Sequence, residues 1–254
     1  MKFDNSVAVI TGGASGLGYA AARELSGRGA RVVIVDRDVE AGHAAAAALG
    51  DNVLFKQADV TDPEAMADVF AFAGELGTPR VAVACAGIGI AERTIDRERN
   101  PHKLDSFKRV IDVNVVGTFN LLRFAAQAIA SADPVETERG VIIATASIAA
   151  YDGQIGQLAY SASKGAIVAM TLPAARDLST VGVRVMAIAP GIMDTPLLGL
   201  LPAEVKANLG RSVPFPKRLG LPDDFGSLVG AICDNPYLNG EVIRLDGALR
   251  MPPK

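Results

Sequence analysis

Apolar residues along the chain fall into short, nearly continuous runs that are separated by longer, alanine-rich stretches. The runs are rich in valine and isoleucine and lie at 7–11, 30–36, 53–59, 80–86, 140–147, 183–190 and 241–246. Uninterrupted apolar strands are typical of a parallel sheet covered on both faces, whereas strands with one wet face alternate apolar and polar residues. The pattern therefore predicts seven parallel strands.

The stretches between the runs carry the helical signal. They lie at 16–28, 39–49, 63–76, 103–131, 157–179 and 222–234. Strands that alternate with helices are joined by right-handed crossovers and form a doubly wound sheet. No linker or change of composition divides the chain. We therefore predict an α/β fold: one Rossmann domain over residues 1–254, with a seven-stranded parallel sheet and helices on both faces.

Three segments lie outside this alternation. Residues 91–103 are strongly charged and residues 131–140 are polar, so we expect both to be solvated loops. Residues 191–221 combine several prolines with many leucines, and their apolar content is high for a surface loop. Long loops with their own packing are often lids or binding loops. We expect this third segment to be a substrate loop.

Composition limits the partners and the location. The net charge is −3 over 254 residues, which gives no reason to expect the basic face of a nucleic-acid-binding protein. The longest apolar run, 81–91, is shorter than the roughly 20 residues that span a bilayer, and the N-terminus lacks the regions of a secretory signal. Cys85 and Cys233 lie far apart and form no metal-ligand spacing. We predict a soluble, cytoplasmic protein without a metal or a membrane partner.

A glycine-rich turn, TGGASGLG, follows the first predicted strand and opens a helix. Its glycines allow a tight turn and let the backbone approach a pyrophosphate at the helix N-terminus, where free N–H groups favour anions. Asp36 ends the second predicted strand, 18 residues after Gly18. A carboxylate there can bind the ribose hydroxyls of NAD and repel the 2′-phosphate of NADP, although the adjacent Arg37 weakens this preference. We predict NAD as the cofactor.

Further candidates lie where other predicted strands end, at the edge that lines the ligand crevice of a doubly wound sheet. Asp59 ends the third strand, and the tripeptide Cys85-Ala86-Gly87 ends the fourth. The position of Asp59 is equally consistent with a residue that caps the helix starting near residue 63. Both interpretations stay open at this point.

The stretch YSASK places Tyr160 and Lys164 on one face of a helix, with Cβ atoms about 5–6 Å apart. An isolated pair of this kind is typical of an ordinary polar helix surface. Here Ser147 ends the fifth predicted strand 13 residues earlier, and Asn114 lies within the long helix. The set TGGASGLG, CAG, Asn114, Ser147, YSASK and PGIMDTP resembles the short-chain dehydrogenase/reductase family over essentially the whole chain.

The resemblance implies that Asn114, Ser147, Tyr160 and Lys164 are catalytic. It also implies a nicotinamide cofactor bound by Gly12, Ser15, Gly16, Leu17, Gly18, Asp36, Asp59, Val60, Cys85, Ala86, Gly87, Tyr160, Lys164, Pro190, Gly191, Ile192 and Thr195. Oxidising an alcohol requires a base for the hydroxyl proton, and a free tyrosine, with a pKa of about 10, is a poor base near neutrality. We expect the Lys164 ammonium to favour the phenolate, Ser147 to hold the substrate oxygen, and Asn114 to hold a water that links Lys164 to solvent.

Stretches such as GQIGQLAYSASKGAIVAMTLPAARDL and NPYLNGEVIRLDGALRMP resemble one branch of the family, the type 2 3-hydroxyacyl-CoA dehydrogenases. This implies a homotetramer that interconverts 3-hydroxyacyl-CoA and 3-ketoacyl-CoA with short or 2-methyl-branched chains. The substrate residues we expect are Ser147, Gln157, Tyr160, Leu198, Leu201 and Phe215. Two alternatives remain: a dehydrogenase of hydroxysteroids or other lipophilic alcohols, and a NAD-binding scaffold subunit of a complex.

Overall fold

Seven parallel strands form one sheet in the order β3-β2-β1-β4-β5-β6-β7. The computed structural model describes residues 3, 5–199 and 201–253. Its strands are β1 (Ser6–Thr11), β2 (Arg31–Asp36), β3 (Val53–Gln57), β4 (Thr78–Ala84), β5 (Gly140–Thr145), β6 (Val183–Pro190) and β7 (Val242–Leu245). The order reverses between β1 and β4, and such a reversal opens a crevice at the carboxyl ends of the two strands.

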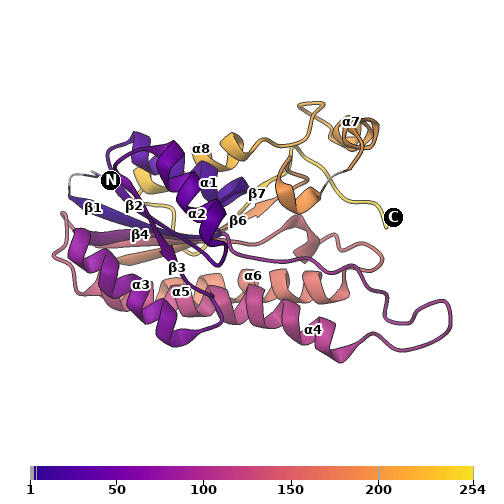
Figure 1. The fold of residues 1–254 in the computed structure, drawn as a ribbon, viewed down its shortest axis with the longest axis horizontal. Coiled ribbons are helices and arrows are strands. Elements are labelled where there is room, and N and C mark those ends of the chain that lie inside the picture. The colour runs from indigo at the N-terminus through magenta and orange to yellow at the C-terminus, as the bar shows by residue number, and fades with distance from the viewer. Residues whose placement is uncertain (1–2, 4, 200, 254) are drawn as a thin grey trace.

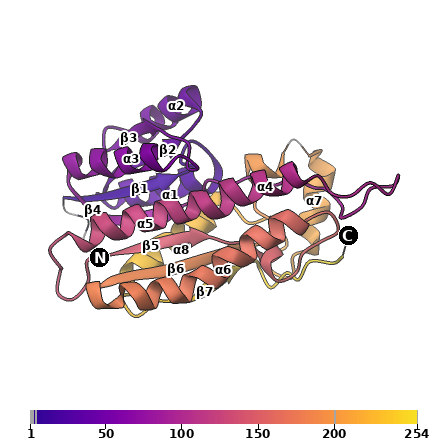
Figure 2. The ribbon, with the colours of Figure 1, turned by 90° about the horizontal axis from the view of Figure 1, so that it is seen from below.

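Helices cover both faces of the sheet (Figure 1). One face carries α1 (Gly16–Gly27), α2 (Val39–Leu49) and α8 (Pro222–Asp234). The other face carries α3 (Pro63–Leu76), α4 (Leu104–Ile111), α5 (Gly117–Ala130) and α6 (Leu158–Leu178). Figure 2 shows α4 and α5 running alongside α6 on this second face. The predicted fold, a doubly wound seven-stranded parallel sheet, is confirmed.

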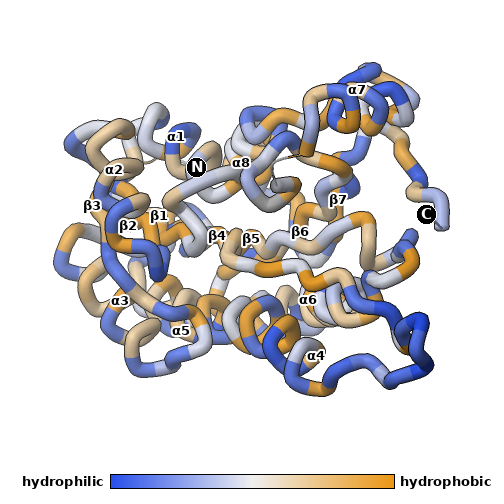
Figure 3. The backbone as a smooth tube through the Cα atoms, turned by 45° about the vertical axis from the view of Figure 1, so that its right-hand side comes forward, coloured by the Kyte–Doolittle hydropathy of each residue, from blue (hydrophilic) through white to orange (hydrophobic). Residues whose placement is uncertain are grey.

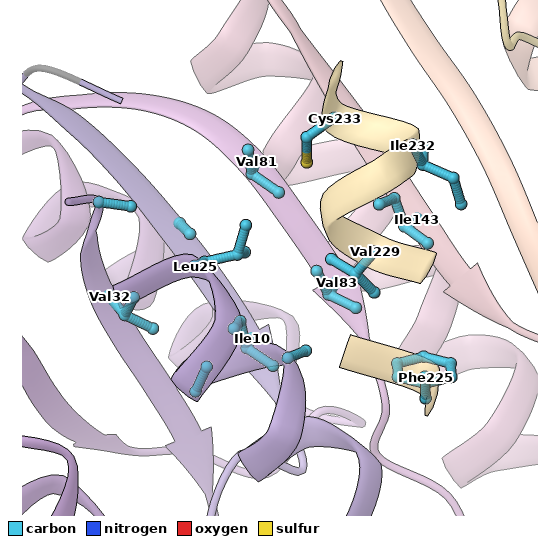
Figure 4. Packing of buried hydrophobic residues seen from close by; sticks show 14 of the residues in the cluster. Ile10, Leu25, Val32, Val81, Val83, Ile143, Phe225, Val229, Ile232 and Cys233 are labelled. Carbon is cyan, nitrogen blue, oxygen red and sulfur yellow. The ribbon is translucent and has the colours of Figure 1, made fainter. Parts of the chain in front are cut away.

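The core consists of an apolar layer on each face of the sheet. On one face, Phe225 and Ile232 of α8, Leu25 of α1 and Ile10 of β1 belong to one buried cluster, in which Ile232 lies beside Ile143 of β5 (Figure 4). Val9 belongs to the layer on the opposite face, because successive side chains of a strand point to opposite sides. Both faces of β1 are therefore buried, which accounts for the unbroken apolar run in the sequence.

The long helix predicted over 103–131 is wrong in its middle. A π-helical turn, η1 (Asp112–Val116), separates α4 from α5. The N–H of Gly117 donates to the carbonyl of Asp112, and the hydroxyl of Thr118 donates to the carbonyl of Asn114 at 2.7 Å. Single π turns inside helices are frequent at functional sites. This one contains Asn114.

The segment 191–221 contains the short turn η4 (Pro196–Leu198) and a helix, α7 (Ala203–Ser212), which the sequence interpretation did not predict. The sequence pattern predicts a loop over this whole segment. Pro202 directly precedes the first residue of α7, where proline is tolerated because the first helical N–H groups have no partner within the helix. A proline at this place starts a helix instead of preventing one.

The charged segment 91–103 is an irregular, hydrophilic excursion that leads into α4 (Figure 3), as predicted. Among the residues that the structure describes, no helix combines the length and the hydropathy that crossing a bilayer requires.

Candidate active site

The glycine-rich turn between β1 and α1 lies directly against the segment that follows β4. A Cβ on Gly12 would lie 2.8 Å from the nitrogen of Ala86, and the φ of Gly12, +65°, is one that favours glycine. A Cβ on Gly18 would lie 2.7 Å from the carbonyl carbon of Gly12. Ser15 begins α1 without a side-chain cap, and the first turn carries no acidic residue. The N-terminus of α1 therefore suits an anionic ligand.

Two carboxylates follow the neighbouring strands. Asp36 ends β2, as predicted, and is half-buried. Asp59 lies two residues beyond the end of β3, where it accepts hydrogen bonds from the N–H of Thr61 at 2.9 Å and its hydroxyl at 2.8 Å. These bonds hold the pKa of Asp59 below its usual value. The cap of α3 is Asp62, whose carboxylate accepts from N–H groups of the first turn. The interpretation of Asp59 as that cap is therefore wrong.

The tripeptide after β4 connects the glycine-rich turn to the predicted catalytic residues. The hydroxyl of Thr145 donates to the sulfur of Cys85 at 3.4 Å, and burial raises the pKa of this thiol to about 11. A Cβ on Gly87 would lie 3.2 Å from Oδ1 of Asn114 and 3.7 Å from Nζ of Lys164. The absence of a side chain at position 87 thus lets this segment run close to both polar groups.

Asn114 is fully buried in the π turn. Its Oδ1 accepts from the N–H of Ile88 at 2.8 Å, and its Nδ2 donates to the carbonyl of Ile88 at 2.9 Å and to Oγ of Ser163 at 3.0 Å. The amide therefore ties the segment after β4 to α6. Its predicted contact with a water that serves Lys164 stays a prediction.

Ser147 and Tyr160 meet across the start of α6. Ser147 lies two residues beyond β5, is buried, and accepts the N–H of Ala149 at 3.1 Å where the turn η2 (Ile148–Ala150) begins. Its hydroxyl lies close enough to the phenol of Tyr160 to favour the phenolate by hydrogen bonding. Burial raises the pKa of Tyr160 above its ordinary value, and the bond to Ser147 opposes this rise.

Lys164 is buried one helical turn after Tyr160. Its Nζ donates to the carbonyl of Thr145 at 2.7 Å and lies 5.7 Å from the centroid of the Tyr160 ring. Burial lowers the pKa of Lys164 to about 8. Burial is the largest influence on the pKa of Tyr160, and the Lys164 ammonium is directed at the carbonyl of Thr145. The expected effect of Lys164 on the acidity of the phenol stays a prediction.

The segment after β6 closes against the glycine-rich turn. Gly191 packs so tightly that a Cβ would lie 2.9 Å from Cα of Asp246. The side chain of Thr195 lies 3.5 Å from the position that a Cβ on Gly16 would occupy. Of the remaining predicted cofactor residues, Leu17 lies in the first turn of α1, Pro190 ends β6 and Ile192 lies two residues beyond it, whereas Val60 lies beside Asp59 in the turn after β3.

The residues predicted to contact the substrate are less closely gathered. Gln157 precedes α6, and its Oε1 accepts the N–H of Gln154 at 3.0 Å. Leu198 is half-buried, whereas Leu201 is 37% exposed and Phe215 is 81% exposed. Phe215 therefore does not wall a closed pocket within one chain. The roles of all four residues stay predictions.

Sequence reasoning missed the groups that hold the catalytic residues in place. The carbonyl of Thr145 binds Lys164, and Ser163 binds Asn114. A backbone acceptor leaves no signal in the sequence. Ser163 lies inside the YSASK stretch, three residues after Tyr160, and this helical spacing is the signal that could have placed it near the catalytic pair.

Comparisons with known proteins agree with this geometry. Residues 6–205 match the family model described as short chain dehydrogenase. The chain is 54% identical to the 3-hydroxyacyl-CoA dehydrogenase type-2 of Homo sapiens, over 97% of this chain and 96% of that protein. It is 50% identical to the protein of the same name from Drosophila melanogaster, over 98% of this chain and 99% of that protein.

A solved structure shows the same architecture. The crystal structure of 3-hydroxyacyl-CoA dehydrogenase type-2 from Mycobacterium avium matches with a TM-score of 0.95 and 43% identity, covering 100% of this chain and 99% of that one. The family match spans most of the chain, and the relatives align over nearly all of it. The chain therefore belongs to the short-chain dehydrogenase family of oxidoreductases.

Proposed function

We propose that the protein is a NAD-dependent dehydrogenase that interconverts 3-hydroxyacyl-CoA and 3-ketoacyl-CoA thioesters with short or 2-methyl-branched chains. One observation carries the proposal. The neighbouring side chains of Ser147 and Tyr160, with Lys164 one helical turn away, belong to a chain that is 50–54% identical, over nearly its full length, to proteins named 3-hydroxyacyl-CoA dehydrogenase type-2.

The residues along the crevice fit a dinucleotide. The uncapped start of α1 offers N–H groups to a pyrophosphate, and side chains at Gly12 or Gly18 would collide with backbone. Thr195 lies close to the turn and is expected to bind the carboxamide end of the cofactor. When bound, the oxidised nicotinamide supplies a hydride acceptor.

We infer a preference for NAD over NADP. Asp36 ends β2, where a carboxylate binds ribose hydroxyls and repels a 2′-phosphate. Arg37 follows directly. The hydrogen bonds from Thr61 are the main cause of the lowered pKa of Asp59, and the charge of Arg37 lowers it further. Since the Asp59 carboxylate partly balances the charge of Arg37, we expect Arg37 to moderate the preference without reversing it.

The catalytic residues divide the proton chemistry among them. Tyr160, as the phenolate, accepts the proton from the oxygen of the substrate hydroxyl, while the hydride leaves the carbon that bears this oxygen. Ser147 donates a hydrogen bond to the substrate oxygen and stabilises the charge that develops on it. The buried Lys164, with a pKa of about 8, is mostly protonated near neutrality and favours the charged form of the phenol once the cofactor adds its positive charge.

The test is NADH formation by the purified protein with a short 3-hydroxyacyl-CoA. Tyr160→Phe removes the base and should lower kcat by about 10²- to 10⁴-fold, while NADH binding persists. Tyr237→Phe is the matched control, because Tyr237 is almost fully exposed. The absence of NADH formation with every such thioester would overturn the substrate assignment.

Two further measurements separate the alternatives. A higher kcat/KM for hydroxysteroids than for thioesters would favour a dehydrogenase of lipophilic alcohols. Unchanged cellular function in Tyr160→Phe would favour a NAD-binding scaffold subunit.

We further propose a homotetramer located in the cytoplasm. The exposed face formed by α4, α5 and α6 carries apolar side chains, and it is the face on which the family resemblance leads us to expect subunit pairing. Leu104 is 63% exposed, Phe119 49% and Leu172 43%. Light scattering coupled to gel filtration tests the assembly, and a monomeric mass would refute it. Imaging of the tagged chain in cells tests the compartment.

A further inference from the structure

The segment between Ser147 and Tyr160 is bound to the C-terminal end of the chain. We call residues 148–157 the connecting loop. The carboxylate of Asp152 in this loop accepts from Nη2 of Arg244 at 2.5 Å. The N–H of Ile155 donates to the carbonyl of Pro253 at 3.0 Å, and Nε2 of Gln154 donates to the carbonyl of Pro252 at 3.0 Å. Three contacts from distant sequence thus converge on one short loop.

Arg244 links three parts of the molecule. It lies on β7, and besides Asp152 its guanidinium donates to Asp246 at 2.7 Å and to the carbonyl of Leu249 at 3.2 Å. Its Cζ also lies 5.1 Å from the centroid of the Tyr151 ring. The side chains of Arg244 and Asp152 are only 22% and 20% exposed, so solvent screens this pair less than a surface pair. Only arginine offers several donors in such a fork.

Apolar contacts lie beneath these polar ones. Leu249 is 4% exposed and forms a small buried cluster with Ile148 and Val213, and Met251 packs against it. Ile148 directly follows Ser147 in the chain. The C-terminal residues therefore pack on the turn that carries the Ser147 hydroxyl.

Both ends of the connecting loop are coupled to the catalytic pair. At its start, the N–H of Asp152 donates to the carbonyl of Ile148 at 2.8 Å, inside the turn that Ser147 caps. At its end, the carbonyl of Gln157 accepts the N–H of Ser161 at 2.7 Å, in the first turn of α6. A shift of this loop therefore moves Ser147 relative to Tyr160.

We propose that Arg244 and residues 249–253, which we call the C-terminal clamp, are positioning residues that set the Ser147 hydroxyl against the Tyr160 phenol. The inference rests on the proposed dehydrogenase chemistry at these two residues. The main contacts of the clamp are with the connecting loop, although Ile192, a predicted cofactor residue, also packs against the cluster that contains Leu249. The loss of the clamp should therefore lower kcat more than it lowers NAD affinity. Misplacement of a catalytic group by about 1 Å can cost on the order of 100-fold in rate.

The first variant is Arg244→Gln, which removes the positive charge and the forked set of guanidinium N–H donors. Its matched control is Arg28→Gln, because Arg28 of α1 binds the carboxylates of Glu24 and Asp234 and lies remote from the catalytic pair. We expect kcat about 10- to 100-fold lower for Arg244→Gln, an intermediate value for Arg244→Lys, and wild-type kcat for Arg28→Gln. Equal losses of kcat in Arg244→Gln and Arg28→Gln would overturn the proposal, because they would indicate a general effect on stability.

A second readout does not depend on the substrate. The chain has four tyrosines and no tryptophan. The titration of Tyr160 is isolated by subtracting the ultraviolet titration of Tyr160→Phe from that of the wild type, and that of the double variant Arg244→Gln/Tyr160→Phe from that of Arg244→Gln. The double variant is needed because Tyr151 lies against Arg244. The bond from Ser147 lowers the pKa of Tyr160, and loosening the clamp should therefore move this titration to higher pH. An unmoved titration in Arg244→Gln would overturn the proposal.

If Arg244→Gln does not fold, a chain that ends at Met251 replaces it. This chain lacks residues 252–254, and with them the carbonyl acceptors of Pro252 and Pro253, but it keeps Arg244 and Leu249. It should show the same two changes to a smaller degree; wild-type kcat and titration would overturn the proposal. If the wild type oxidises no thioester but the Tyr160 titration still moves to higher pH in Arg244→Gln, the proposed substrate is wrong and the positioning role of the clamp is supported.

Discussion

Replacement of Gly18 by alanine is the sharpest test of the proposed dinucleotide turn. A Cβ at this position would lie 2.7 Å from the carbonyl carbon of Gly12 and closer still to its oxygen. Non-bonded carbon atoms normally approach to about 3.5–4.0 Å. The turn must therefore open by roughly 1 Å, or α1 must move away from β1 by a similar distance. The carbonyl carbon and oxygen of Gly12 are backbone atoms, which cannot move aside as the end of a flexible side chain could.

The expected magnitude follows from this geometry. Overpacking of this kind costs about 1–3 kcal/mol. Opening the turn also moves the N–H groups at the start of α1 away from a bound pyrophosphate. If the same energy is lost from cofactor binding, the Kd for NADH rises by roughly 5- to 150-fold, since 1.4 kcal/mol corresponds to a factor of ten.

The assay is the fluorescence of NADH bound to the purified variant, combined with thermal unfolding. Gly27→Ala is the control, because Gly27 ends the same helix and a Cβ there meets nothing within 4 Å. Alanine at Gly27 should stabilise the protein by about 0.4–1 kcal/mol and leave NADH binding unchanged. Wild-type NADH affinity in Gly18→Ala would refute the assignment of this turn as the pyrophosphate site.

Three further variants address the cofactor, the assembly and the buried lysine. Asp36→Ala should weaken NAD binding by about tenfold, or 1.4 kcal/mol, and raise the affinity for NADP relative to NAD; an unchanged ratio of the two Kd values would contradict the role of Asp36. Phe119→Asp places a charge on the exposed face of α5 and should reduce the mass in light scattering below that of a tetramer; an intact tetramer would place the interface elsewhere. Lys164→Met removes a buried ammonium whose pKa is about 8 instead of the usual 10.5, a difference worth roughly 3 kcal/mol. Because the folded state binds the proton less tightly, this penalty is full below pH 8 and vanishes above 10.5. Without cofactor, the variant should therefore have a larger free energy of unfolding in urea than the wild type at pH 7. The loss of the hydrogen bond to Thr145 reduces this difference, and the difference should shrink toward pH 10.5. A difference in the free energy of unfolding that does not change with pH would contradict this reasoning.

The sheet could be predicted because burial on both faces leaves a strong local signal. Every predicted strand overlaps an observed one, the strand at 183–190 coincides at both ends, and no other end differs by more than two residues. These differences matter at the site. Ser147 and Asp59 were predicted to end their strands, whereas β5 stops at Thr145 and β3 at Gln57. Both residues instead lie in the turns that follow, and each accepts a backbone N–H two residues further along the chain.

The parts that could not be predicted depend on contacts between residues distant in sequence. The π turn at Asn114 coincides with an amide that pairs with the backbone of Ile88 and with Ser163. The bond from Arg244 to Asp152 spans 92 residues. No periodicity reports such contacts, because each depends on how the complete sheet places its loops.

The segment from Cys85 to Ile88 explains why the cofactor turn and the catalytic residues form one site. On one side, it approaches Gly12 so closely that a Cβ on that glycine would collide with the backbone. On the other, Gly87 and Ile88 contact Asn114, and Asn114 holds Ser163 of the helix that carries Tyr160. The catalytic helix is thus fixed to the dinucleotide turn through backbone and one buried amide. Since proton and hydride leave the same substrate carbinol, the base and the hydride acceptor must keep a fixed separation, and this rigid connection provides it.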